Sequence, residues 1–298
     1  MHGSSAAPDQ SRQATLIGFG AIALWGALAV LTAMTGAVPP LQLSVCTFGL
    51  GALFLAIIVI ARGRAAALAP TPASLLLGIF GIFGDTLLYF FALKFAPPAE
   101  ANLIHYLWPL LIVLFAALLP GGRLRAGHLI GAALGLAALL LLIGGRLGAE
   151  APRGAIIGYA CAATGALVWA SYSVLSRRVA SVPSESIAAT CAVAALIALP
   201  LHLAFETTVW PQGAEWAGVI GLGLGPMGAA FLLWDYGMKK GDVPLLGVLS
   251  YSAPVISTLI LVAAGYAELR LALAGAVVLI VAGALIATRA DKAEPQAR

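Results

Sequence analysis

The sequence predicts an all-α integral membrane protein with ten transmembrane helices, arranged as two inverted five-helix repeats. Its composition, its long apolar runs and an internal repeat support this fold class. Charged residues make up 9% of the 298 residues and hydrophobic residues 61%, whereas soluble domains carry roughly 25% charged residues. This composition excludes a soluble enzyme.

Apolar runs of about 18 residues or more can cross the ~30 Å hydrocarbon layer as helices. Ten such runs follow one another, and only the third contains a charged residue, Asp85. Their hydrophobicity is continuous and does not alternate, which favours helices over the strands of a barrel. The predicted spans are 14–36, 40–61, 73–93, 101–122, 126–145, 154–176, 186–205, 216–234, 243–267 and 271–288.

These spans divide the chain into two halves of five helices each. The predicted parts are a flexible cytoplasmic N-terminus (1–13), the first repeat (14–145), an extracytoplasmic linker (146–153), the second repeat (154–288) and a cytoplasmic tail (289–298).

The connections between spans differ in charge. With both termini in the cytoplasm, twelve Lys and Arg residues fall inside and four outside, the four being Lys94, Arg146, Arg153 and Arg270. The positive-inside rule therefore predicts cytoplasmic termini. The same bias accounts for the net charge of +4, so no nucleic-acid partner is expected.

The two halves repeat each other at an offset of 145 residues. The offset pairs Gly78 with Gly223, Lys94 with Lys239, Tyr106 with Tyr251, Pro109 with Pro254 and Arg125 with Arg270. Because five is an odd number, the second copy enters the membrane in the opposite sense. Inverted repeats place a site near the midplane and permit alternating access. Duplication also builds inert scaffolds, so a non-transporting receptor or scaffold stays an alternative.

The sequence NLIHYLWPLL opens the fourth span, and LSYSAPVIS takes the equivalent place in the ninth. With the repeat pattern, these segments resemble the EamA branch of the drug/metabolite transporter superfamily over essentially the whole chain. The resemblance implies a multi-pass exporter of the bacterial inner membrane. It also implies a central cavity lined by spans 1, 3, 4, 6, 8 and 9.

Pro109 and Pro254 lie inside predicted spans. Proline removes one helical hydrogen bond and crowds the carbonyl four residues earlier, which frees the carbonyls of His105 and Ser250. In a cavity these oxygens could accept hydrogen bonds from a substrate ammonium, which suits an amino acid. A packing kink is the alternative for each proline, but their matched positions favour a role in gating.

Aromatic and polar residues on the central spans are the candidate substrate-binding residues. Tyr106 and Trp108 offer a surface for ring stacking and cation–π contact, and His105 supplies a hydrogen bond. Anchoring at the membrane interface is the alternative for these residues. The other aromatic and serine candidates are Trp25 on the first span, Trp169 on the sixth, and Ser250 and Tyr251 on the ninth.

Asp85 lies deep in the third span, where a charge costs on the order of 3 kcal/mol. It could bind a proton or a substrate ammonium, with Tyr89 one turn away on the same face. Alternatively it is neutral, or hydrogen-bonded to a neighbouring helix. Proton coupling and facilitated diffusion therefore both fit the sequence.

Together these features predict an exporter of amino acids, aromatic or bulky neutral ones above all, working by alternating access. Efflux of drugs or other small metabolites is the alternative. However, the first span lacks the acidic residue expected of small multidrug exporters, and no span carries the Lys or Arg needed for sugar phosphates. An intramembrane aspartyl protease is disfavoured because Ile82 replaces the glycine of its motif.

No cofactor or metal is expected. The chain has no glycine-rich phosphate loop, and Cys46, Cys161 and Cys191 lack metal-ligand spacing. The expected partners are an amino acid substrate and the lipid bilayer. The repeat allows one chain to build the whole pathway, so a monomer is sufficient and the oligomeric state stays open.

Overall fold

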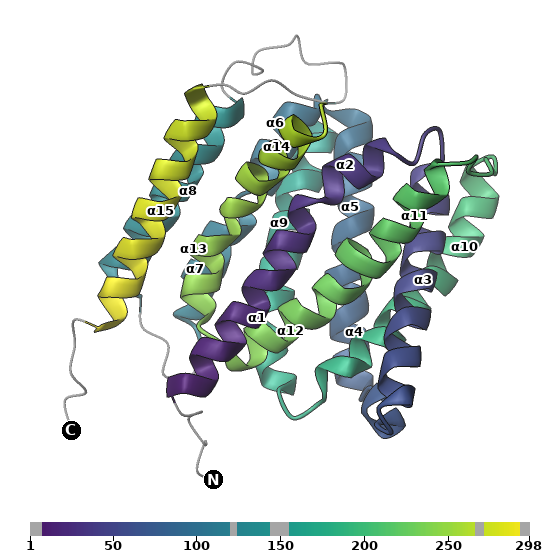
Figure 1. The fold of residues 1–298 in the computed structure, drawn as a ribbon, viewed down its shortest axis with the longest axis horizontal. Coiled ribbons are helices and arrows are strands. Elements are labelled where there is room, and N and C mark those ends of the chain that lie inside the picture. Colours follow the sequence, from purple (N-terminus) through teal and green to yellow (C-terminus); the bar gives the residue numbers. More distant parts are fainter. Residues whose placement is uncertain (1–7, 120–123, 144–154, 266–270, 293–298) are drawn as a thin grey trace.

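The computed structural model describes residues 8–119, 124–143, 155–265 and 271–292, and all regular structure in these ranges is helical (Figure 1). In the described part of the chain, seven helices of 21 to 26 residues are long and apolar enough to cross a membrane. Three shorter apolar helices accompany them: Glu100–Ala116, Ala126–Leu141 and Leu271–Ala287. This architecture fits a multi-pass helical membrane protein.

The first half contains α1 (Pro8–Gly26), α2 (Leu28–Ala33), α3 (Pro40–Ala61), a 3₁₀ turn η1 (Ala65–Leu68), α4 (Pro72–Gly78), a π-helical turn η2 (Ile79–Phe83), α5 (Gly84–Phe95), α6 (Pro98–His105), α7 (Trp108–Ala116) and α8 (Ala126–Ile143). The second half contains α9 (Ala155–Leu175), the 3₁₀ turns η4 (Ser176–Val179) and η5 (Ser184–Ser186), α10 (Ile187–Phe205), α11 (Glu215–Leu224), a π-helical turn η6 (Gly225–Ala229), α12 (Ala230–Lys240), α13 (Val243–Ser250), α14 (Ser252–Ala263) and α15 (Leu271–Lys292).

The helices extend beyond the apolar runs at both ends of the chain. α1 begins at Pro8 and therefore includes residues 8–13, which were expected to be flexible. Proline suits the first helical position, and Asp9 in the first turn interacts favourably with the helix dipole. α15 likewise continues to Lys292, into the expected tail. The predicted linker 146–153 lies outside the described residues.

The same irregularities occur at matched places in both halves. The π-helical turn η2 separates α4 from α5, and η6 separates α11 from α12. A π-helical turn shifts the helix face that follows it, and such turns occur often at functional sites. The third and eighth predicted spans therefore share one unusual feature.

The fourth and ninth predicted spans are both interrupted just before their prolines, Pro109 and Pro254. α6 ends at His105 and α7 begins at Trp108, just before Pro109. The N–H of Leu107 donates to the Ile104 carbonyl at 3.1 Å, three residues back instead of four. In the second half the break falls at Tyr251, whose N–H donates three residues back to Val248 at 3.3 Å. Proline causes such breaks because it supplies no N–H to the helix.

The main helix contacts join one half to the other. α1 packs on α12 and α5 packs on α9, while α8 pairs with α15 and α3 pairs with α10. The last two pairs lie at opposite sides of the molecule in Figure 1. We call the end of the bundle at which α1 begins and α15 ends the termini end, and the opposite end the far end (Figure 1).

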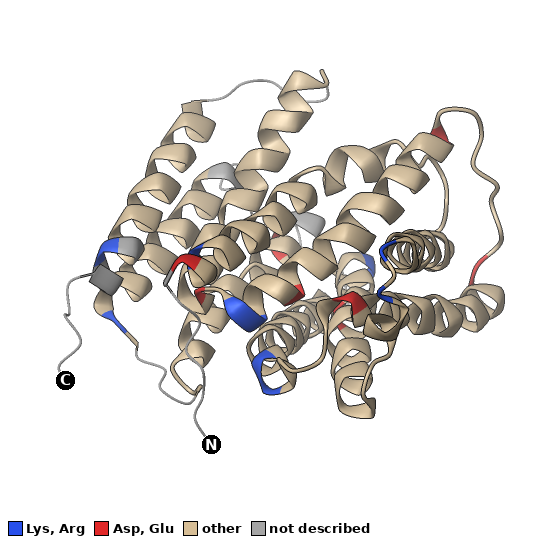
Figure 2. Cartoon of the chain, turned by 60° about the horizontal axis from the view of Figure 1, so that its bottom comes forward, with Lys and Arg blue, Asp and Glu red and all other residues tan. Residues whose placement is uncertain are grey.

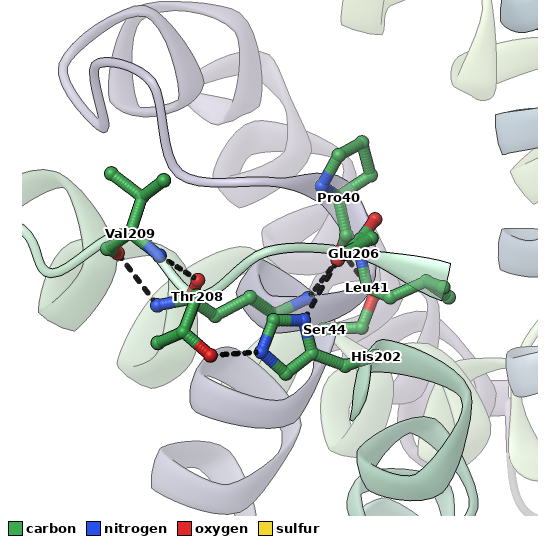
Figure 3. Close-up of polar contacts among 8 residues, drawn as sticks. Pro40, Leu41, Ser44, His202, Glu206, Thr208 and Val209 are labelled. Carbon is green, nitrogen blue, oxygen red and sulfur yellow. Dashed lines mark hydrogen bonds and ion pairs between the residues drawn. The ribbon is translucent and has the colours of Figure 1, made fainter. Parts of the chain in front are cut away.

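The α3–α10 pair is fastened at the far end by the Glu206 carboxylate (Figure 3). Its two oxygens accept hydrogen bonds from the backbone N–H groups of Leu41 and Gln42, at 2.9 and 3.0 Å. A carboxylate suits this place because helix N-termini carry unpaired N–H groups and partial positive charge. The Gln42 side chain also exchanges two hydrogen bonds with the backbone of Val209, at 2.7 and 2.8 Å.

His202 completes this network, which Figure 3 shows in full. Its Nδ1 lies 3.0 Å from Glu206 Oε2, and its Nε2 lies 2.9 Å from Thr208 Oγ1. At the termini end an ion pair of 2.5 Å joins Arg64, after α3, to Glu185, before α10. α3 and α10 are therefore held together at both ends.

The close approach of α3 to η6 gives a first prediction. A Cβ on Gly51 would lie 2.9 Å from the Gly223 carbonyl oxygen and the Gly228 Cα, both backbone atoms that cannot move aside cheaply. We expect Gly51→Ala to lower the free energy of unfolding by about 1–3 kcal/mol, the usual cost of overpacking. The measurement is thermal unfolding of the purified protein in detergent.

Gly49→Ala is the matched control, two residues away on the same helix. Its Cβ would meet only the Ala195 Cβ at 4.0 Å, and alanine favours a helix over glycine. An equal loss of stability in both variants would contradict the packing described for α3.

Candidate functional site

Four tryptophans from four helices meet at the centre of the molecule: Trp25 (α1), Trp108 (α7), Trp169 (α9) and Trp234 (α12). The ring centroids of Trp25 lie 5.5 Å from Trp169 and 5.3 Å from Trp234. Trp108 lies 6.2 Å from Trp169 and 5.9 Å from Trp234, both edge-on. We call these four residues the tryptophan cluster. Two of them come from each half of the chain.

Hydrogen bonds fix two of these rings. The Trp25 Nε1 donates to the Pro226 carbonyl in η6 at 3.0 Å. The Trp234 Nε1 donates to the Ser173 hydroxyl of α9, also at 3.0 Å. A buried indole N–H needs such an acceptor, so these contacts set the orientation of both rings.

Other aromatic rings surround the cluster. Phe231 lies one turn before Trp234 on α12, and its ring is 5.9 Å from both Trp25 and Trp169. Tyr172 lies 5.4 Å from Trp169. The rings fill the centre in this conformation, because Trp108, Trp169 and Trp234 are only 7%, 5% and 0% exposed.

A polar pair lies next to the cluster. His105 Nε2, at the end of α6, lies 2.7 Å from Asp85 Oδ1 on α5. Both side chains are largely buried. The Tyr89 ring lies 4.7 Å from the His105 ring, and its hydroxyl donates to Asn102 Oδ1 at 2.7 Å. The predicted residues Asp85, Tyr89 and His105 therefore form one polar group, stabilised by Asn102.

Gly165 lets α9 pack closely over this pair. A Cβ at Gly165 would lie 3.0 Å from Asp85 Oδ1 and 3.2 Å from the His105 ring. Trp169 follows Gly165 by about one helical turn, and Trp108 follows His105 by three residues. The polar pair thus lies about one turn from the tryptophan cluster, on the side of the far end.

The structure places two other predicted residues elsewhere. Tyr251 is 1% exposed and belongs to the apolar cluster formed with α8 and α15. Its ring lies against Gly135 of α8, where an added Cβ would come within 2.2 Å of Tyr251 Cδ2. Ser250 is buried too, and its hydroxyl donates to the Leu246 carbonyl of its own helix at 2.7 Å. Tyr106 is closer to the centre, with its ring 6.4 Å from Trp108.

Sequence reasoning did not select Trp234 as a site residue, although it is fully buried in the cluster. One signal was present, because the offset of 145 residues pairs Trp234 with Tyr89, which was selected. Its neighbour Asp235 forms a buried ion pair of 2.7 Å with Lys239, four residues further along the same helix.

The described residues hold no group of three or more His, Cys, Asp or Glu side chains that could bind a metal ion. The site therefore offers aromatic faces and one acid–imidazole pair, inside a bundle of apolar helices. Ionisable groups inside a membrane span mark a candidate functional site, so these residues form the candidate site of this multi-pass helical protein.

Comparison with known proteins identifies the family. The sequence profile of the EamA-like transporter family matches residues 12–144 and 156–289. The chain therefore belongs to the EamA-like transporter family, and the resemblance seen in the sequence is confirmed. It is a multi-pass inner-membrane transporter and not an enzyme.

Relatives of known name agree with this assignment. The chain is 52% identical over 278 residues to the "Aromatic amino acid exporter YddG" of Ancylobacter novellus, covering 92% of this chain and 96% of that protein. A protein of the same name from Salmonella typhimurium is 28% identical over 170 residues, covering 53% of this chain and 56% of that protein. A solved crystal structure superposes with a TM-score of 0.91 at 51% identity, over 95% of this chain and 99% of that chain.

The polar pair gives a second prediction. His105→Ala leaves the Asp85 carboxylate buried without its partner, and we expect a loss of about 3 kcal/mol in the free energy of unfolding. The double variant Asp85→Asn/His105→Ala removes the charge as well, so it should lose less stability than His105→Ala alone. Thermal unfolding in detergent measures both. If the double variant is the less stable of the two, the buried Asp85 side chain does not depend on His105 as its partner.

Proposed function

We propose that this transporter exports aromatic and other bulky neutral amino acids across the inner membrane by alternating access. The tryptophan cluster carries this proposal, because rings from both halves meet beside the Asp85–His105 pair. An aromatic surface next to a carboxylate complements the ring and the ammonium of an aromatic amino acid. The exporter name of the relative at 52% identity supports the same substrate class.

Each part of the substrate has a counterpart in the site. Asp85 accepts hydrogen bonds from the substrate ammonium, and His105 donates to the substrate carboxylate once it releases Asp85. Trp108 and Trp169 stack on the substrate ring, with Trp25 behind them. Tyr89 and Tyr106 border the polar side. Ser250 and Tyr251 lie outside this group, and Tyr251 packs against α8 and α15.

Substrate entry requires the rings to separate, because the cluster is closed in this conformation. The helix breaks before Trp108 and at Tyr251 are the places where the backbone can hinge, since Pro109 and Pro254 supply no backbone N–H to the preceding turn. Pro109 and Pro254 maintain these breaks, and we assign them a gating role. Opening at one break and closing at the other alternates access between the two ends.

We further propose that ten spans form two inverted repeats. The seven long helices and the three shorter apolar ones together give ten. The recurrence of a π-helical turn and of a proline break in each half supports the repeat. So do the pairings of α1 with α12 and α9 with α5, which exchange under a pseudo-two-fold axis.

The distribution of charge supports cytoplasmic termini. Lys94 lies in the last turn of α5, which ends at the far end, whereas Lys239 and Lys240 lie in the last turn of α12, which ends at the termini end (Figure 1). Basic residues coloured in Figure 2 gather mainly at helix ends. The positive-inside rule then places the termini end in the cytoplasm. Export would run from the termini end to the far end.

Counterflow in liposomes tests the proposal. The purified protein is reconstituted, and exchange of radiolabelled phenylalanine, threonine, ethidium and a sugar phosphate is compared. We expect saturable exchange of phenylalanine. Exchange of ethidium alone would instead make the protein a multidrug exporter, and binding of phenylalanine without any exchange would make it a receptor or scaffold.

A third prediction concerns the cluster. Trp169→Leu removes an aromatic face and keeps an apolar side chain, so phenylalanine exchange should fall about tenfold, with threonine affected less, in line with the energy of one aromatic pair. Trp210→Leu is the control, because Trp210 is 69% exposed and away from the cluster. Equal losses for phenylalanine and threonine would show general damage and contradict the stacking role.

A further inference from the structure

A groove of about 290 Å³ lies between α3 and α12, in the half of the bundle nearest the termini end. Ile58 of α3 and Leu232 and Leu233 of α12 line its walls, and Arg62 and Arg64 lie at its rim. The groove is separate from the tryptophan cluster, although Leu233 directly precedes Trp234 in the chain.

The rim of this groove carries one uncompensated positive charge. Glu185 also lies at the rim, but Arg64 neutralises it through the ion pair of 2.5 Å. Arg62 is exposed at the C-cap of α3 and has no acidic partner within ion-pair distance among the residues that the structure describes. The groove therefore combines apolar walls with the unpaired guanidinium of Arg62 at its rim.

A second groove of the same kind occurs at the same end. It has a volume of about 260 Å³ and lies between the ends of α7 and α9, lined by Phe115, Leu118 and Leu175, with Arg178 at its rim. Arg178 is exposed, and no described residue forms an ion pair with it. The combination of apolar walls and a free arginine thus appears twice, on different pairs of helices.

We propose that each groove binds an anionic phospholipid of the cytoplasmic leaflet, with one acyl chain along the apolar walls and the phosphate on the arginine. The proposal rests on the proposed orientation, which puts the termini end in that leaflet. Both volumes lie near the ~300 Å³ lower end of small-ligand pockets, which is enough room for a segment of an acyl chain.

Physical chemistry favours this occupant over water or a free ion. Apolar walls at membrane depth are filled by hydrocarbon, because water gains few hydrogen bonds there. Guanidinium binds phosphate oxygens in pairs, and basic pockets between helices on the cytoplasmic side recognise anionic headgroups. The α3–α12 lipid would press on the helix that carries Trp234, so transport should respond to the lipid as well.

Native mass spectrometry of the full-length protein tests the proposal, with added phosphatidylglycerol or phosphatidylcholine. We expect the wild type to retain two phosphatidylglycerol molecules in preference to phosphatidylcholine. Arg62→Gln should weaken one site about fivefold, in keeping with the contribution of one basic residue near an anionic membrane. Arg62→Gln/Arg178→Gln should weaken both sites. Arg289→Gln, an exposed arginine at the same end on α15, is the control and should change nothing.

Leu232→Trp tests the contribution of the acyl chain apart from that of the headgroup, because the larger side chain fills the α3–α12 groove and leaves both arginines in place. It should also lower phosphatidylglycerol retention. Unchanged retention in both Leu232→Trp and Arg62→Gln/Arg178→Gln would overturn the proposal. So would thermal stabilisation by inorganic phosphate as large as that by phosphatidylglycerol, since the site would then bind a free anion.

This result is independent of the counterflow experiment. A protein that retains phosphatidylglycerol but exchanges no amino acid would support the lipid sites and contradict the proposed export. A protein that exchanges phenylalanine but retains phosphatidylglycerol no better than phosphatidylcholine would support the proposed export and contradict the lipid sites.

Discussion

Contact among four tryptophans is the interaction on which the centre of this protein depends. Trp25 and Trp108 come from the first half and Trp169 and Trp234 from the second, so the cluster joins the halves where they meet. Inside a membrane, packing holds helices together, because lipid tails are as apolar as the side chains. Large interlocking rings supply that packing, and the Ser173 and Pro226 acceptors fix their orientation.

The apolar surroundings make the Asp85–His105 pair costly to bury. A carboxylate at this depth costs on the order of 3 kcal/mol, and the His105 contact at 2.7 Å offsets part of that cost. Another hydrogen-bond donor at the same distance could offset the same cost of burying the Asp85 carboxylate in place of His105. In the proposed mechanism, a substrate ammonium replaces His105 as the partner of Asp85, and this exchange would link substrate binding to movement of α6 and to the break before Trp108.

Much of the architecture could be predicted from the sequence, because the apolar runs and the matched prolines are local signals. Pro109 and Pro254 break their helices as their chemistry requires. The partner of Asp85 could not be predicted, because His105 lies 20 residues away on another helix and only packing decides which residue faces it. Trp234 was not selected because only packing shows that its ring meets those of Trp25 and Trp108. Tyr251 was selected for its repeat position, but Gly135 leaves space for its ring on α8 instead.

The central claim is that the ring of the substrate enters the tryptophan cluster, and intrinsic fluorescence tests it most directly. Four of the six tryptophans belong to the cluster, and phenylalanine itself contributes almost no emission when tryptophan is excited selectively. Phenylalanine added to the reconstituted protein should cause a saturable change in emission, and Trp169→Leu should abolish most of it. Saturable phenylalanine exchange without any change in emission would contradict the claim and place the binding site elsewhere.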